Sequence, residues 1–219
     1  MSQRDIFNHD MNLLGWFRAV KGERTYKDGR FPYSGMYIFT GSQGSGKTYS
    51  MIYLVTQIRK EYPDVPILTD IEMYGIDNII QYRSIEDIDR YSSDKGLVVV
   101  LDEIHLLFSS LTSKDSSHTD LQTWSQNRKN NRLILGTSQR FSRIAKPIRE
   151  QCSGNIEIRR GIFPGTNFYR YINAEDYDDS GKLILTGEER PKWNFFIKHT
   201  EIFKLYDTLY QIKGDICKK

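Results

Sequence analysis

One eight-residue segment constrains the fold of this chain more than any other. Residues 41–48 read Gly-Ser-Gln-Gly-Ser-Gly-Lys-Thr, which matches the phosphate-binding P-loop pattern G-x-x-x-x-G-K-[ST] at every position. An apolar, β-prone segment precedes the motif at 35–40, and a helical pattern follows it at 49–62. The motif therefore lies at a strand-to-helix turn, which is the context that a nucleotide-binding P-loop requires.

The residue types of this motif suit a nucleoside triphosphate and Mg²⁺. Its glycines let backbone N–H groups wrap a phosphate, and the helix N-terminus adds partial positive charge. Lys47 is expected to reach the β- and γ-phosphates, and the Thr48 hydroxyl is expected to ligate Mg²⁺. The predicted nucleotide-binding residues are Gly41, Ser42, Gln43, Gly44, Ser45, Gly46, Lys47, Thr48 and Tyr49.

A second signal is the apolar run at 97–101, which ends in Asp102 and Glu103. A continuous β-branched run is typical of a strand that is buried on both faces of a parallel sheet. A carboxylate at the end of such a strand is where a Walker B Asp meets the magnesium shell. We assign Asp102 to Mg²⁺ through water and Glu103 to the general base that activates the attacking water. The alternative is that the pair only caps the exit of the strand into solvent.

Composition fits one soluble α/β domain. The chain has 219 residues, of which 38% are hydrophobic and 27% are charged. It contains no apolar stretch of membrane-spanning length and no secretory signal at its start. Cys152 and Cys217 have neither a motif spacing nor a framework, so reduced thiols in a cytoplasm are expected.

Net charge is only +3, but the basic residues are unevenly distributed. The nine basic residues between 128 and 160 face only two acidic ones, Glu150 and Glu157. The basic ones are Arg128, Lys129, Arg132, Arg140, Arg143, Lys146, Arg149, Arg159 and Arg160. This cluster is consistent with DNA binding, with arginines donated to a neighbouring subunit's nucleotide, or with a solvated basic face.

The order of elements predicts a RecA-like P-loop NTPase, an α/β fold with a mainly parallel sheet flanked by helices. Strands are predicted at 35–40, 67–71, 97–101, 132–137, 156–159 and 168–172, and helices at 49–62, 84–88, 120–130, 144–152 and 200–212. In such a sheet the strand at 132–137 lies between the P-loop strand and the Asp-Glu strand. Gln139 would then lie near the γ-phosphate, as a sensor or as a cap of the turn.

The chain divides into an N-terminal extension at 1–34, an ATPase core at 35–175 and a C-terminal extension at 176–219. The segment 109–119 is rich in Ser, Thr and Asp and is predicted to be a flexible loop. It carries Lys114 and His118, and it is either a pore loop that touches DNA or an ordinary surface loop.

Several classes of P-loop protein do not fit. Residues 102–105 look like the DExH box of a helicase, but no room remains for a second RecA-like domain. The signature of ABC ATPases is absent, and so is the base-reading loop of GTPases. Asp70, close to the second predicted strand, keeps a small-molecule kinase open.

The combination of motifs resembles one family. The P-loop, Asp102-Glu103-Ile104-His105, the segments 124–131 and 133–139, and the segment 144–149 look like the FtsK/HerA superfamily of DNA-pumping ATPases. The resemblance is strongest to its branch of Zot-like filamentous phage assembly proteins and to viral genome-packaging ATPases. It covers about residues 35–160.

The resemblance implies an ATP hydrolase that uses Mg²⁺ and acts on DNA as a homo-oligomeric ring, for which a hexamer is one option. It implies that Gln139 is the sensor after the core strand. It also implies that Arg128 or Arg132 is donated across the subunit interface, because both match the region where Zot-like proteins have a basic pair after a helix. His is often present in that region, whereas this sequence has Asn or Lys there. Zot-like proteins usually carry a membrane span, which this sequence lacks, so a packaging or DNA-transfer motor is favoured over extrusion. A nucleotide-dependent assembly switch is the non-motor alternative. A capsid vertex or a membrane complex is the expected further partner, in the host cytoplasm or associated with virions.

Overall fold

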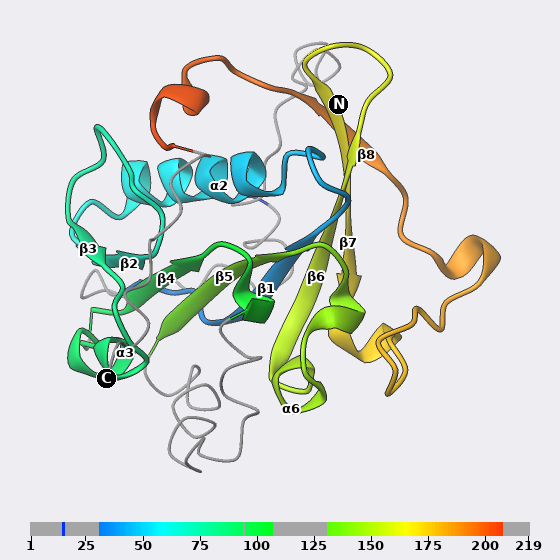
Figure 1. Ribbon diagram of the computed structural model, residues 1–219, viewed down its shortest axis with the longest axis horizontal. Coiled ribbons are helices and arrows are strands. Elements are labelled where there is room, and N and C mark those ends of the chain that lie inside the picture. The colour runs from blue at the N-terminus through cyan, green and yellow to red at the C-terminus, as the bar shows by residue number, and fades with distance from the viewer. Residues whose placement is uncertain (1–14, 16–30, 94, 107–130, 208–219) are drawn as a thin grey trace, which may run out of the picture.

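The computed structural model describes residues 15, 31–93, 95–106 and 131–207, and within these ranges it forms a single twisted sheet with helices on both faces (Figure 1). The strands are β1 (Gly35–Thr40), β2 (Ile67–Thr69), β3 (Ile79–Gln81), β4 (Leu97–Leu101), β5 (Arg132–Ser138), β6 (Cys152–Arg160), β7 (Thr166–Asn173) and β8 (Asn194–Ile197). The α-helices are α2 (Lys47–Glu61), α3 (Glu86–Arg90) and α6 (Lys146–Arg149). Short 3₁₀ turns are η2 (Phe141–Arg143), η3 (Ala174–Asp176), η4 (Gly187–Glu189) and η5 (Ile202–Lys204).

The eight strands have the order β3-β2-β4-β5-β1-β6-β7-β8. All pairs from β3 to β6 are parallel, and β7 and β8 continue the sheet in antiparallel fashion. β5 lies between β1 and β4, which confirms the predicted position of this strand and the RecA-like fold class. The carboxyl ends of parallel strands meet at one edge of a sheet, so the segments that follow β1, β4 and β5 are brought together.

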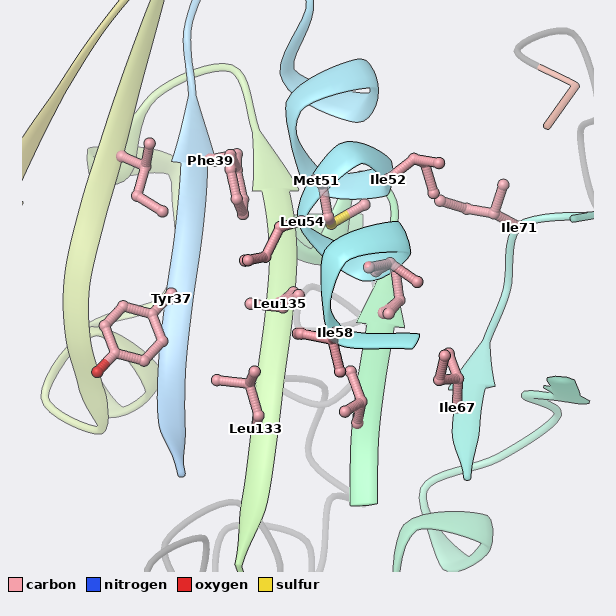
Figure 2. Packing of buried hydrophobic residues seen from close by; sticks show 14 of the residues in the cluster. Tyr37, Phe39, Met51, Ile52, Leu54, Ile58, Ile67, Ile71, Leu133 and Leu135 are labelled. Atoms are coloured by element: carbon pink, nitrogen blue, oxygen red, sulfur yellow. The ribbon is translucent and has the colours of Figure 1, made fainter. Parts of the chain in front are cut away.

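The central strands are buried on both faces, as their continuous apolar runs predict. Alternate residues of β1 and β5, such as Phe39 and Leu135, pack against Leu54 and Ile58 of α2 (Figure 2). The other face of the same strands packs against Ile88 of α3 and against Ile148 of α6. Burial of these side chains removes the P-loop strand from solvent and fixes its two neighbours.

Two predicted helices differ in the structure. The segment 144–152 contains only the short α6, and Cys152 already begins β6, because Gly154 and its neighbours pair with β1 instead of continuing a helix. The described part of 200–212 contains only the 3₁₀ turn η5, after which Tyr206 bridges to Met73. The predicted α-helix is therefore wrong over residues 200–207. The predicted helix at 120–130 lies outside the described residues.

Two strands were not predicted from the sequence. β3 has three residues and β8 has four, and both lie at the edges of the sheet with partly exposed side chains. β8 pairs with β7, so the described part of the C-terminal extension belongs to the same sheet as the core. After β8 the chain crosses back over α2, where Ile202 and Tyr206 join the buried cluster (Figure 1).

Candidate nucleotide site

The P-loop forms the turn between β1 and α2, as the sequence predicts. Gly41, Gly44 and Gly46 have positive φ angles of 155°, 73° and 92°. A Cβ at Gly41 would collide with the carbonyl oxygen of Ile158, so glycine is required there for close packing as well as for its backbone angle. The loop is thus held in the wrapped conformation that presents N–H groups to an anion.

The start of α2 is electropositive. Its first turn contains no acidic residue, and Gly46 caps it without a side-chain hydrogen bond, an arrangement that suits an anion such as a phosphate. Lys47 is a buried residue, and its ammonium donates a hydrogen bond of 3.2 Å to the backbone carbonyl of Ser42 within the same loop. These features fit the triphosphate that the motif predicts.

Thr48 and Asp102 lie side by side, although 54 residues separate them in the sequence. The Thr48 hydroxyl donates to Oδ1 of Asp102 at 3.2 Å, and the hydroxyl of Thr137 donates to the same carboxylate oxygen. A hydroxyl and a carboxylate in contact at the edge of a P-loop are the ligand types that Mg²⁺ accepts, usually together with waters and substrate phosphates. The residues present therefore fit the predicted ion, which when bound would neutralise charge on the phosphates.

Asp70 supports this carboxylate from behind. Its Oδ1 accepts a hydrogen bond of 2.9 Å from the backbone N–H of Asp102. Burial raises the pKa of Asp70 to about 7, the nearby charge of Asp102 adds to the rise, and the hydrogen bond from Asp102 opposes it. The side chain that the sequence left open as a kinase's substrate ligand is thus bonded to the Walker B turn.

Glu103 has a left-handed backbone with φ of 45°, which is uncommon for a residue with a side chain and occurs preferentially at functional sites. Its N–H donates to the Thr137 hydroxyl at 2.9 Å, so one threonine fixes both carboxylate residues. Its Oε2 lies 3.2 Å from Nδ1 of His105, which also lies 3.4 Å from the hydroxyl of Ser138.

Gln139 directly follows β5, and its neighbour Ser138 pairs with Thr40 at the start of the P-loop. The predicted sensor therefore lies at the same edge of the sheet as the P-loop and the Asp-Glu pair. Sequence reasoning missed Thr137 and His105, which hold the two carboxylates. Both residues are present in predicted motifs, but Thr137 meets Asp102 and Glu103 only because β5 pairs with β4.

The structure disfavours Arg132 as an arginine that reaches a neighbouring subunit. This residue begins β5, at the opposite edge of the sheet from the P-loop, and is only 2% exposed. Its guanidinium pairs with the Asp89 carboxylate at 2.5 Å and donates to the Ser92 hydroxyl at 2.6 Å. Arg128, the other candidate, lies outside the described residues, as does the loop at 109–119 with Lys114 and His118.

The basic cluster of the sequence separates into parts. Lys146 pairs with Asp179 at 2.8 Å, and Arg149 donates to backbone carbonyls, so both tie α6 to neighbouring turns. Arg159 pairs with Glu157. Arg140 and Arg143 are exposed and follow Gln139 at the edge that carries the P-loop.

Comparison with known proteins identifies one family model and several solved structures that this chain resembles. The family model described as zonular occludens toxin (Zot) matches residues 35–211. The N-terminal domain of zonular occludens toxin from Neisseria meningitidis is 14% identical and has a TM-score of 0.57, covering 80% of this chain and 100% of that chain. No curated protein matches this chain.

Two further solved structures share the fold. The DNA-packaging ATPase of Sulfolobus turreted icosahedral virus is 11% identical over 73% of this chain and 96% of its own, with a TM-score of 0.50. The flagellar accessory protein FlaH of Methanocaldococcus jannaschii is also 11% identical, over 81% of this chain and 96% of its own, with the same TM-score. At these identities the likeness shows the fold alone.

Proposed function

This chain belongs to the zonular occludens toxin (Zot) family, and we propose that it is a Mg²⁺-dependent ATPase that moves or packages DNA for a virus or mobile element. The observation that carries the proposal is the convergence of the P-loop, Thr48, Asp102 and Glu103 at one edge of the sheet. Such an arrangement binds a triphosphate, and it places a carboxylate beside the phosphates that can activate water.

The roles of the chain's own residues follow from their contacts. Lys47 and the N-terminus of α2 bind the phosphates, the Thr48 hydroxyl would ligate the magnesium ion, and Asp102 would hold that ion through water. Glu103 accepts the proton of the attacking water, and His105 orients the Glu103 carboxylate. Gln139 acts as the sensor at the tip of β5.

In this function the chain acts on DNA as a homo-oligomeric ring. Arg140 and Arg143 are exposed at the edge of the sheet that carries the P-loop. We propose that they contact DNA phosphates there, so that a movement driven by the nucleotide is transmitted to the DNA. Lys114 in the loop 109–119 is a further proposed phosphate contact. Arg128 is the proposed arginine that acts on a neighbouring subunit's nucleotide, in a ring that docks on a capsid vertex or a membrane complex.

The alternative is a phage assembly or extrusion ATPase, which the family match favours. A nucleotide-dependent assembly switch that moves no DNA is a third reading, and a small-molecule kinase is the weakest. No helix of the described residues is long and apolar enough to span a membrane.

ATP turnover measured with and without DNA, together with the mass of the assembly, tests the proposal. Lys47→Ala should abolish tight ATP binding and turnover. Glu103→Gln should still bind ATP but hydrolyse it about 10²-fold more slowly or worse, because the base is lost while its shape remains. Normal hydrolysis by Glu103→Gln would refute the role of this residue.

DNA separates the alternatives. A motor should hydrolyse ATP faster when DNA is added, and its DNA affinity should fall steeply with salt as counterions are released. Arg140→Gln with Arg143→Gln should reduce that salt dependence, whereas Arg90→Gln, an exposed arginine at the end of α3 near the opposite edge of the sheet, is the control. Turnover that DNA does not change, in a ring of normal mass, would support the switch. A phosphorylated small molecule as product would support the kinase.

A further inference from the structure

Three residues from the far end of the described chain reach the edge of the sheet that carries the P-loop. β6 is parallel to β1, and β7 and β8 each reverse direction, so the end of β6, the start of β7 and the end of β8 all lie at this edge. Arg160 ends β6 and pairs with Asn167 near the start of β7. Lys198 follows β8, and its N–H donates to the carbonyl of Gly165 at 2.8 Å.

Lys198 packs directly against the P-loop backbone. A Cβ at Gly46 would lie 3.2 Å from its Cε atom and 3.3 Å from its ammonium nitrogen, and 2.5 Å from Nδ2 of Asn167. Asn167 is fully buried, and this Nδ2 donates a hydrogen bond to the backbone carbonyl of Ser45. The P-loop is therefore clamped from its β7–β8 side, and a second lysine stands beside the residue that caps α2.

The charge of Lys198 is not balanced by the described residues. None of their carboxylates forms an ion pair with Lys198 or Arg160. The ammonium is half-buried and lies 5.9 Å from the ring centres of both Tyr49 and Phe203. Burial, and secondly the positive charge of Arg160, lower the pKa of Lys198. Both causes would be offset by a bound anion.

Strand order shows which part of an anion Lys198 would meet. Thr48 and Asp102 meet on the β4–β5 side of β1, so the magnesium ion and the γ-phosphate belong on that side. Lys198 approaches from the β6–β8 side, and after β8 the chain turns back over α2 (Figure 1).

We infer that Lys198 is a second phosphate-binding cation, which contacts the α- and β-phosphates of the nucleotide from the side opposite the metal, with Arg160 reinforcing its field. This inference rests on the proposed ATPase function and adds a binding residue supplied by the C-terminal extension. It makes binding of ATP and of ADP equally dependent on Lys198, since both carry these two phosphates.

Calorimetric titration of ATP and ADP, each with Mg²⁺, against Lys198→Met tests the inference. This change removes the charge but keeps an unbranched side chain of similar length. Both nucleotides should bind about tenfold more weakly or worse, because a charge-assisted hydrogen bond is lost. Lys198→Arg should restore part of the affinity. The control is Lys192→Met, an exposed lysine at the other end of β8.

Two results of the titration would overturn the inference. Unchanged affinity for both nucleotides overturns it, and weaker binding of ATP alone assigns Lys198 to the γ-phosphate and overturns it as well. If thermal melting shows that Lys198→Met does not fold, Arg160→Gln takes its place and should weaken ATP and ADP equally but less. If the unaltered protein binds neither nucleotide, the proposed function itself fails, whereas binding that Lys198→Met leaves unchanged removes only this inference.

Discussion

The guanidinium of Arg132 is committed to the interior of its own subunit. The Arg132 side chain is almost completely buried, whereas that of its partner Asp89 is 55% exposed. The ion pair therefore links the buried start of β5 to the end of α3, which lies at the surface. Buried arginines need such a partner because an unpaired charge in the interior is costly. A residue held in this way contributes to stability, and it is poorly placed to act on another molecule.

Replacing Asp89 and replacing Arg132 should therefore lower the free energy of unfolding by different amounts. Asp89→Ala should lower the free energy of unfolding by about 1–3 kcal/mol, because the buried guanidinium loses its carboxylate. Arg132→Met should cost less, since Asp89 can turn to water. Urea unfolding measures both. ATP turnover per folded molecule should not change in Arg132→Met, and a large loss at normal stability would restore Arg132 as the arginine that acts in trans.

His105 gives a second prediction at the level of single residues. Its imidazole is 14% exposed and contacts the Glu103 carboxylate, so its removal leaves that carboxylate free to adopt other rotamers. His105→Ala should lower the maximal rate of ATP turnover, but by less than the roughly 10²-fold expected when the base itself is removed, because the Glu103 carboxylate remains and only its orientation is lost. The affinity for ATP should stay the same. His105→Gln, which keeps a hydrogen-bonding group, should recover part of the rate, and a parallel loss of ATP affinity would indicate a merely structural role.

The turn that follows β4 packs tightly onto the neighbouring strand β5, and the side chain of Ile104 fills the space between them. Gly136 in β5 lies beneath Ile104, and a Cβ there would come within 2.8 to 3.1 Å of three atoms of that side chain. Ile104 lies between Glu103 and His105 in the sequence. The position of Glu103, the proposed base, therefore depends on the absence of a side chain at Gly136 in the neighbouring strand.

Gly136→Ala should destabilise the fold by about 1–3 kcal/mol through overpacking, and it should reduce turnover more than it reduces ATP binding. Chemical denaturation and steady-state kinetics measure the two effects. The double variant Gly136→Ala with Ile104→Val should regain part of both, because the shorter side chain makes room. A single variant with normal stability and rate would show that the turn can shift without consequence.

The elements also show what the sequence could and could not predict. The long apolar runs of β1, β4 and β5 were predictable because each is buried on both faces, and so was the P-loop, whose pattern is local. The contact of Thr48 with Asp102 followed from strand order. β8 could not be predicted, because three of its four residues are exposed and its apolar pattern is too short. The role of Thr137 and the proximity of Lys198 to Gly46 depend on pairing between distant strands, which composition does not reveal.

One edge of the sheet carries the P-loop, Asp102, Glu103, Gln139 and the two exposed arginines Arg140 and Arg143. Under the proposed function, nucleotide binding, hydrolysis and DNA contact would all take place at this edge. If an arginine acts in trans in the proposed ring, the same edge faces the neighbouring subunit.

Mixing of subunits tests that arrangement. If Arg128 acts on a neighbour's nucleotide, Arg128→Ala subunits and Lys47→Ala subunits should each be inactive alone but partly active when mixed, because some interfaces then combine an intact arginine with an intact P-loop. The arginine effect is worth up to about 10³-fold in rate where it operates. No recovery in mixtures that still form rings would argue against action in trans.

The insertion of β5 between β1 and β4 has a consequence for the newborn chain. β1 cannot pair with β5 until residues near Leu133 have been synthesised, although Gly35 is made much earlier. The contact of Lys198 with the P-loop forms later still, after residues near 198 have emerged from the ribosome. Sheets built from such distant pairings form slowly, and their unpaired apolar strands attract other chains in the meantime. Until β8 is available to pair, a nascent polypeptide of this type would expose open sheet edges, where chaperones can bind.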